Sequence, residues 1–260
     1  MKALITGASC GIGREIAREL ARRGCDLVLC SRNAAALQAV ADELAGTVNC
    51  TVVAQDLGSR DGVKNLYHKT KDLGINILVN NAGFGTFGPF AETDLETELD
   101  LIDLNVSAVH ALTKLFLLDF KKRGDRCFIL NVSSMAGFFA GPLFASYYAS
   151  KNYVTRLTEA LAVELKHARS NVSVSLLCPG PVHTSFGLRA GVGFGAAGTP
   201  IELVARNAVD GMFAGTLYIV PGILYKFLKF ASAFLPTMLA AEIVGKLQGS
   251  KNLAKRYKKS

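Results

Sequence analysis

Short apolar segments rich in β-branched residues alternate with longer amphipathic segments along most of the chain. Several short segments are apolar at nearly every position, which is typical of strands covered on both faces. The expected strands are Lys2–Thr6, Asp26–Cys30, Cys50–Ala54, Asn76–Val79, Arg126–Val132 and Asn171–Leu177. The expected helices cover residues 12–23, 33–45, 60–73, 95–121 and 147–168. This alternation predicts βαβ units, and therefore an α/β fold with a doubly wound, mostly parallel sheet and helices on both faces.

Two later segments depart from this pattern. Residues 187–198 contain five glycines, so we expect a lid that orders over bound ligands; a flexible loop without a role is the alternative. Residues 216–248 are apolar but interrupted by prolines and lysines, which predicts a helical C-terminal extension at the domain edge. Because no linker divides the chain, residues 1–260 are expected to form a single domain, with the lid and extension over 187–248 and a basic tail over 250–260.

Composition narrows the classes of protein that fit. The 260 residues are 50% hydrophobic and 19% charged, which excludes a disordered chain. The net charge is +8, but five basic residues lie between 251 and 259, so the excess is mostly in the tail and nucleic acid is not an expected partner. Six cysteines form no CxxC pair, no secretory leader precedes the first strand, and no apolar run reaches the about 18 residues of a membrane span. We therefore expect a cytoplasmic protein without disulfides or a metal site, since the four histidines lack metal-ligand spacing.

A glycine-rich turn joins the first expected strand to the first expected helix. It reads TGASCGIG over residues 6–13. Glycine lets backbone N–H groups approach a pyrophosphate, and the start of a helix adds a favourable dipole. The turn therefore favours a dinucleotide site, although a tight packing turn is the alternative. The candidate contacts are Gly7, Ser9, Gly11, Ile12 and Gly13.

The end of the second strand bears on which dinucleotide binds. An acidic residue there would accept a hydrogen bond from the ribose 2′-hydroxyl of NAD, but the sequence has Ser31 and Arg32. The Arg32 guanidinium can pair with a 2′-phosphate, and no carboxylate repels that charge. These residues favour NADP(H) as the cofactor; a solvated arginine without a role is the alternative.

An ordered series of further motifs follows the glycine turn. These are Asp56-Leu57, Asn80-Asn81-Ala82-Gly83, Asn105, Asn131-Val132-Ser133-Ser134, Tyr147-xxx-Lys151 and Pro179-Gly180-x-Val182-x-Thr184. In this order the chain resembles the short-chain dehydrogenase/reductase family, over residues 1 to about 185. The resemblance implies a Rossmann-type domain and an oxidoreductase that uses a nicotinamide cofactor.

A tyrosine followed four residues later by a lysine carries the expected chemistry. On a helix this spacing puts both side chains on one face. Only the second of three such pairs follows a strand that ends in Asn-Val-Ser-Ser, where a parallel sheet places its ligand crevice. The pairs are Tyr67/Lys71, Tyr147/Lys151 and Tyr225/Lys229, and the first and third are expected to be surface or packing pairs.

Reduction of a ketone needs a hydride at the carbonyl carbon and a proton at its oxygen. Tyr147 is predicted to donate that proton, and Ser134 to hold the oxygen. The Lys151 ammonium, together with the nicotinamide cation of the oxidised cofactor, is expected to draw the pKa of Tyr147 from about 10 toward neutrality. Tyr148 lacks an ammonium one helical turn further on, and Ser133 is expected to be structural.

The resemblance also assigns roles that spacing alone does not. It implies that Lys151 binds the nicotinamide ribose and that Asn105 orders a water relay behind it. Further cofactor contacts are implied after the third, fourth and sixth strands, at Asp56, Leu57, Asn81, Ala82, Gly83, Pro179, Gly180, Val182 and Thr184. A capping carboxylate at Asp56 and a tight turn at 80–83 are the local alternatives.

Aromatic residues and methionine are frequent around the expected nicotinamide end, at Phe84, Phe87, Phe90, Met135, Phe138, Phe139, Leu143, Phe144, Phe186 and Phe194. An aromatic-lined concavity favours a hydrophobic carbonyl or alcohol as the small-molecule substrate, and core packing is the alternative. Helices 105–121 and 147–165 are expected to pack on the sheet and, by the resemblance, to form a homodimer or homotetramer. Ile223–Leu235 is expected to cover the pocket or contact another subunit; an anionic membrane surface is the less favoured alternative.

These features predict hydride transfer between NADP(H) and the carbonyl or hydroxyl group of a hydrophobic substrate. One alternative is an NAD-dependent alcohol or hydroxysteroid dehydrogenase. Another is a dinucleotide-sensing binding protein, which would need the glycine turn but not Ser134, Tyr147 and Lys151.

Overall fold

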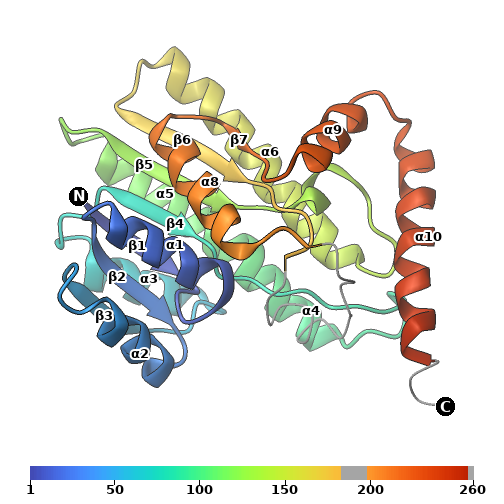
Figure 1. Cartoon of the computed structure of the whole chain (residues 1–260), viewed down its shortest axis with the longest axis horizontal. Coiled ribbons are helices and arrows are strands. Elements are labelled where there is room, and N and C mark those ends of the chain that lie inside the picture. The colour runs from blue at the N-terminus through green and yellow to red at the C-terminus, as the bar shows by residue number, and fades with distance from the viewer. Residues whose placement is uncertain (183–197, 257–260) are drawn as a thin grey trace.

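One sheet of seven strands organises the molecule. The computed structural model describes residues 1–182 and 198–256. The strands run in the order β3-β2-β1-β4-β5-β6-β7, and every neighbouring pair is parallel (Figure 1). Their bounds are β1 (Lys2–Thr6), β2 (Asp26–Ser31), β3 (Cys50–Ala54), β4 (Ile77–Asn80), β5 (Cys127–Val132), β6 (Val172–Leu177) and β7 (Tyr218–Ile219). The predicted α/β fold is confirmed, with a sheet that is wholly rather than mostly parallel.

The six predicted strands are present, and their ends differ from the predicted ones by one residue at most. The seventh strand, β7, was not predicted. The two residues of β7 pair with Leu176 and Leu177 of β6. Such a short strand owes its conformation to this distant pairing, so local pattern alone does not reveal it.

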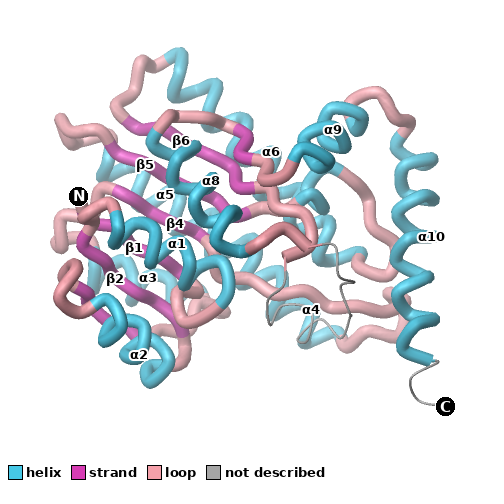
Figure 2. Tube along the Cα trace, in the orientation of Figure 1, coloured by secondary structure: helices cyan, strands magenta, loops and turns pink. Residues whose placement is uncertain are grey.

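Helices cover both faces of the sheet (Figure 2). Side chains of β1 alternate between two core clusters: Ala3 and Ile5 join the cluster with α1, α2 and α8, whereas Leu4 joins the cluster with α3 and α5. The bounds are α1 (Gly11–Arg22), α2 (Ala34–Leu44), α3 (Arg60–Thr70), α4 (Leu95–Ile102), η1 (Asp103–Ala108), α5 (Val109–Phe120), η2 (Met135–Phe138), α6 (Ala145–His167), α8 (Ile201–Phe213), α9 (Ile223–Ser232) and α10 (Thr237–Arg256). The five predicted helices are present, the third ending earlier than expected, and α8 was not predicted.

The strand order places a crevice at one edge of the sheet. The chain moves outward from β1 to β3 on one side and from β4 to β7 on the other. At such a reversal, the connections leave the carboxyl ends of β1 and β4 in opposite directions, which opens a space for a ligand. The glycine turn follows β1 and the Asn80–Gly83 turn follows β4, so both predicted motifs lie at this point.

The helical stretch Leu95–Phe120 combines α4, the π-helical turn η1 and α5. Within residues 1–182 and 198–256 it is the one stretch whose length and composition would suit a membrane span. Its side chains Leu112, Phe116 and Phe120 are buried in the core cluster against the sheet. Contacts of this kind are those of a core helix.

The C-terminal extension lies beyond the end of the sheet, at the side of the molecule opposite β3 (Figure 1). Gln248 of α10 donates a hydrogen bond from Nε2 to the Tyr148 hydroxyl over 2.8 Å. The predicted edge helices are therefore present. The predicted lid at 187–198 falls almost wholly outside the described residues, as do Thr184, Phe186 and Phe194.

Candidate active site

Ser134, Tyr147 and Lys151 meet at the carboxyl end of β5. Ser134 directly follows Ser133 at the end of that strand, and α6 presents Tyr147 and Lys151 one turn apart. Ser134 and Tyr147 share a side-chain hydrogen bond. Lys151 Nζ lies 5.8 Å from the centroid of the Tyr147 ring and donates to the Val132 carbonyl over 2.9 Å. The three predicted catalytic side chains are thus brought together at the expected edge of the sheet.

Burial controls the protonation of this group. It raises the pKa of Tyr147 to about 12, against the lowering effect of the hydrogen bond with Ser134. It lowers the pKa of Lys151 to about 8. For these side chains alone, desolvation of the phenolate dominates. The expected shift toward neutrality included the nicotinamide cation and stays a prediction. At neutral pH the site holds a protonated phenol beside an ammonium, which suits proton donation.

Asn105 lies behind these residues in the π-helical turn η1, an irregularity often found at functional sites. Its buried side chain accepts from Phe84 N–H over 3.1 Å and donates to the Phe84 carbonyl over 2.9 Å. It also donates to Ser150 Oγ over 3.1 Å. Asn105 therefore fixes the turn after β4 to α6, the helix that carries Lys151.

A chain of buried amides and hydroxyls supports the ends of β4 and β5. Asn80 Nδ2 donates to Asn131 Oδ1 over 2.9 Å and to Thr113 Oγ1 over 3.0 Å. Asn131 Nδ2 in turn donates to Thr158 Oγ1 over 2.8 Å. The sequence analysis missed Thr113 and Thr158. The feature that could have revealed them is a threonine among the apolar residues of a helix face that packs on the sheet.

The glycine turn is built against the Asn80–Gly83 turn. Gly7 and Gly11 have φ of 66° and 58°, a region that disfavours residues with a Cβ. Asn81 Nδ2 donates to the carbonyls of Thr6 and Gly7 over 2.9 and 3.2 Å. The side chain of the N-cap residue Cys10 makes no capping hydrogen bond to the first turn of α1, which is compatible with N–H groups that face a phosphate.

Replacing Gly13 with alanine is expected to weaken dinucleotide binding at least about 10-fold. An added Cβ would lie 2.4 Å from both the Gly7 carbonyl oxygen and Asn81 Nδ2, so the turn must shift. A shift of 1 Å in such a site has large effects. Fluorescence titration with NADPH measures the change. Gly124→Ala is the matched control, since nothing lies within 4 Å of its added Cβ; equal Kd values for both variants would contradict the assignment.

Of the residues predicted to bind the adenosine end of the cofactor, some have side chains placed to do so and others do not. Ser31 ends β2, and its Oγ is buried without a hydrogen-bond partner among the described residues. Arg32 is exposed beside it and makes no ion pair within the described part of the chain. Asp56 Oδ1 accepts from Gly58 N–H over 3.0 Å, so the local alternative of a turn carboxylate is present. Leu57 is buried in the core, which leaves its side chain unable to contact a ligand.

The segment after β6 forms the other wall. Pro179 and Val182 are buried, and the Pro179 carbonyl accepts from Met135 N–H over 3.0 Å. Gly180 lies against the ring of Tyr225, where an added Cβ would be 2.2 Å from the ring. The third tyrosine–lysine pair thus packs beside a predicted cofactor residue, a contact that sequence reasoning missed because 45 residues separate the two.

The predicted aromatic residues separate into different groups. Phe87, Phe144 and Tyr147 pack together, with centroid distances of 4.9 and 5.9 Å along the series. Leu143 precedes Phe144 with φ of 66°, a strained backbone of the kind found at functional sites. Phe90 is exposed. The aromatic lining is therefore confined mainly to the loops after β4 and β5.

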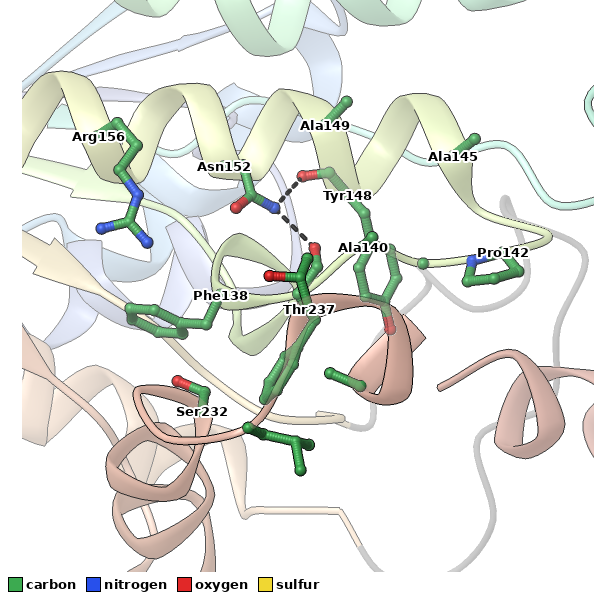
Figure 3. Close-up of a pocket in the computed structure, with 14 residues that line it drawn as sticks. Phe138, Ala140, Pro142, Ala145, Tyr148, Ala149, Asn152, Arg156, Ser232 and Thr237 are labelled. Carbon is green, nitrogen blue, oxygen red and sulfur yellow. Dashed lines mark hydrogen bonds between the residues drawn. The ribbon is translucent and has the colours of Figure 1, made fainter. Parts of the chain in front are cut away.

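A separate cavity of about 550 Å³ lies between α6, the residue 138–142 loop and the start of α10 (Figure 3). Tyr148 and Asn152 line it, each one residue beyond Tyr147 and Lys151. One residue turns an α-helix by about 100°, so this cavity meets a different face of α6 from the catalytic pair. Asn152 Nδ2 donates to the Phe139 and Tyr148 carbonyls, which ties the loop to α6.

Comparison with known proteins places this geometry in a family. The family model described as short chain dehydrogenase matches residues 1–190. The chain is 39% identical over 182 residues to the very-long-chain 3-oxoacyl-CoA reductase of Mycosarcoma maydis, which covers 67% of this chain and 51% of the relative, so the match spans about half of that protein. It is 38% identical over 185 residues to oxidoreductase UcpA of Salmonella typhimurium, covering 70% of this chain and 69% of the relative.

Solved structures share the fold over most of the chain. A short-chain dehydrogenase from Sphingobium yanoikuyae in complex with NADPH is 29% identical, with a TM-score of 0.82 over 90% of this chain and 93% of that one. The bulky-bulky ketone specific alcohol dehydrogenase from Comamonas testosteroni is 26% identical, with a TM-score of 0.77 over 90% of this chain and 91% of that one. The extent of the family match, with the agreement of the fold, shows that the chain belongs to the short-chain dehydrogenase/reductase family.

Proposed function

We propose that the protein transfers a hydride between NADP(H) and the carbonyl or hydroxyl group of a hydrophobic small molecule, acting as a ketone reductase. The observation that carries this proposal is the grouping of Ser134, Tyr147 and Lys151 next to the Asn80–Gly83 turn, against which the glycine turn packs. A binding protein for dinucleotides would need the turn alone, and no binding role requires a buried phenol with an ammonium next to it.

Each side chain has a defined task in the proposed reaction. Ser134 donates a hydrogen bond to the carbonyl oxygen and holds it next to the Tyr147 hydroxyl. Tyr147 gives its proton to that oxygen as negative charge develops there. The Lys151 ammonium stabilises the phenolate that remains. When bound, the nicotinamide supplies the hydride, and its oxidised form adds a second positive charge near Tyr147.

The Arg32 guanidinium supports NADP(H) over NAD. It is exposed at the end of β2, and its neighbours in the chain, Ser31 and Asn33, bear no charge that would repel a 2′-phosphate. The NADPH complex of the Sphingobium yanoikuyae relative is consistent with this choice. A structural relative from Burkholderia phymatum was solved with NAD, at 26% identity and a TM-score of 0.81, so an NAD-dependent dehydrogenase is the second candidate.

Replacing Arg32 with aspartate is expected to lower the preference for NADPH over NADH by about 10- to 100-fold. The variant removes a charge-assisted hydrogen bond of about 1.5–3 kcal/mol and adds a carboxylate that the 2′-phosphate repels. The ratio of kcat/KM values for the two cofactors measures the effect. Arg60→Asp, an exposed arginine at the start of α3, is the control; an unchanged ratio in the Arg32 variant would remove the basis for assigning NADP(H).

The proposed substrate class rests on the aromatic cluster next to Tyr147. Phe87 and Phe144 offer an apolar wall, and Ser134 with Tyr147 offers one polar anchor. A relative that is specific for bulky-bulky ketones supports the same class. A screen of NADPH oxidation across carbonyl compounds, with the Tyr147→Phe protein as blank, is the test. We expect long aliphatic or polycyclic ketones to react faster than small hydrophilic keto acids, and the opposite order would contradict the proposal.

A further inference from the structure

We propose that the outward face of α9 and the adjoining part of α10 bind the surface of an anionic lipid bilayer. The proposal concerns where the protein resides and is independent of the reaction at Tyr147.

The apolar stripe of α9 faces away from the protein. Ile223, Phe227 and Phe230 are spaced by four and three residues, which puts them on one side of α9. Phe234 lies in the turn after the end of α9, with its ring centroid 5.1 Å from that of Phe230. Their side chains are exposed, Ile223 by 86% and Phe234 by 74%. A surface helix of a soluble protein normally turns its apolar stripe toward the core. Here the stripe is available to a partner.

Contacts on the opposite side of α9 hold this orientation. Tyr225 packs against Gly180, and Lys229 Nζ lies 3.7 Å above the centroid of the Tyr218 ring. Ser232, on the same side, lines the cavity of Figure 3. None of the ten residues of α9 is fully buried. The helix is thus fixed by its less apolar side, and its phenylalanines remain in solvent.

Exposed apolar side chains are also frequent on α10. Ten of the nineteen large apolar side chains that are exposed among the described residues lie between residues 223 and 247. Met238, at 74% exposure, and Leu247, at 61%, belong to this group. Ala240, Ala241 and Gln248 of the same helix are buried. Such a concentration of exposed apolar side chains in one part of the chain marks an interaction site.

Charge identifies the partner. Residues 216–260 contain eight of the 29 basic residues and one of the 21 acidic residues, and therefore a net charge of +7 of the total +8. A helix with exposed aromatic and aliphatic side chains, in a part of the sequence with an excess of lysine and arginine, is suited to the boundary between lipid headgroups and acyl chains. The negative surface of a bilayer attracts such basic segments.

A second copy of the chain is a poorer partner for this surface. A two-fold symmetric contact brings the same patch of both copies together. Two copies of a basic segment would then come together, and like charges across an interface are unfavourable. An anionic bilayer satisfies both the apolar stripe and the charge.

Flotation with lipid vesicles tests the proposal. The full chain is mixed at low salt with vesicles of phosphatidylcholine and phosphatidylglycerol, or with vesicles of phosphatidylcholine alone. We expect binding to the anionic vesicles, at least 10-fold weaker binding to the neutral ones, and loss of binding as salt is raised. The double variant Phe227→Asp/Phe234→Asp is expected to lose at least 10-fold in binding. Val163→Asp, at an exposed apolar position on α6, is the matched control and should bind as the wild type does.

Two results would overturn the proposal. One is that the wild-type protein does not bind anionic vesicles at low salt, and the other is that the double variant binds them as well as the wild type does. Analytical ultracentrifugation without lipid tests whether a second copy of the chain binds this surface instead. If the wild-type protein forms a dimer that the double variant does not form, and no vesicles are bound, the surface serves self-association. NADPH binding, measured alongside, is expected to stay unchanged in every variant, because none of the substituted residues lies at the glycine turn.

Discussion

Tyr147→Phe is expected to lower the rate of ketone reduction at least about 1,000-fold while NADPH binding remains within about 2-fold of wild type. General acid catalysis contributes about 10²- to 10⁴-fold, and among the residues that the structure describes around Tyr147 we expect no other acid to replace the phenol. The Ser134 hydroxyl can still donate a hydrogen bond in the variant, but it is too weak an acid to give up its proton. Lys151 Nζ donates to the Val132 carbonyl and so is directed away from this task. The phenyl ring of the variant keeps the packing with Phe144, so the fold should persist.

The measurement is kcat for NADPH oxidation with the best ketone of the screen, together with a fluorescence titration of NADPH. Tyr148→Phe is the matched control. Its hydroxyl accepts a hydrogen bond from Gln248 and lies on the cavity side of α6, away from Lys151. We expect this control to keep most of the activity. Similar losses in both variants would point to disturbance of α6 rather than to an acid at Tyr147.

Lys151→Met is expected to lower the rate at least about 100-fold, because the phenolate left after proton transfer loses its neighbouring positive charge. The wild-type rate of reduction is also expected to fall as pH rises through about 8, where Lys151 loses its proton. Tyr147 stays protonated over that range, since burial raises its pKa to about 12. The residual rate of Lys151→Met should show no such decrease. A pH profile of kcat for both proteins is the measurement.

Lys151 should also affect how the stability of the protein depends on pH. The pKa of this lysine is lower in the folded chain than its ordinary 10.5, so folding is disfavoured while the buried ammonium is charged. The contribution of Lys151 to the free energy of unfolding should therefore increase as pH rises from about 8 to about 10.5, where the unfolded chain still binds the proton. Burial raises the pKa values of the Cys30, Cys127 and Cys178 thiols, which changes the stability in the opposite direction above pH 9. The effect of Lys151 is therefore measured as the difference in free energy of unfolding between the wild-type protein and Lys151→Met. Lys166→Met, at the exposed end of α6, should alter neither rate nor this pH dependence. A wild-type rate independent of pH up to 10 would contradict the assignment of Lys151.

Much of the architecture is encoded locally. The strands that are apolar on both faces, such as Ile77–Asn80 and Cys127–Val132, stand out because helices cover both sides of the sheet. The glycine turn stands out for a different reason, since Gly7 and Gly11 adopt positive φ. The order of these signals along the chain was sufficient to predict the crevice.

Other features depend on contacts between distant segments. The pairing that forms β7 and the packing of Tyr225 on Gly180 join residues more than 40 positions apart. The raised pKa of Tyr147 in the chain alone was not predicted, because spacing reveals its neighbour Lys151 but not the depth of burial. The sequence also could not show which face of α9 packs against the rest of the protein, although it does show an apolar stripe along this helix.

Stopped-flow mixing of the NADPH complex with excess ketone tests the central claim most directly, because a single turnover separates the chemical step from product release. The assignment of Tyr147 as the proton donor predicts a rapid loss of NADPH absorbance in wild type and in Tyr148→Phe, and at least about a 1,000-fold slower loss in Tyr147→Phe. A rapid phase of wild-type rate in Tyr147→Phe would contradict it.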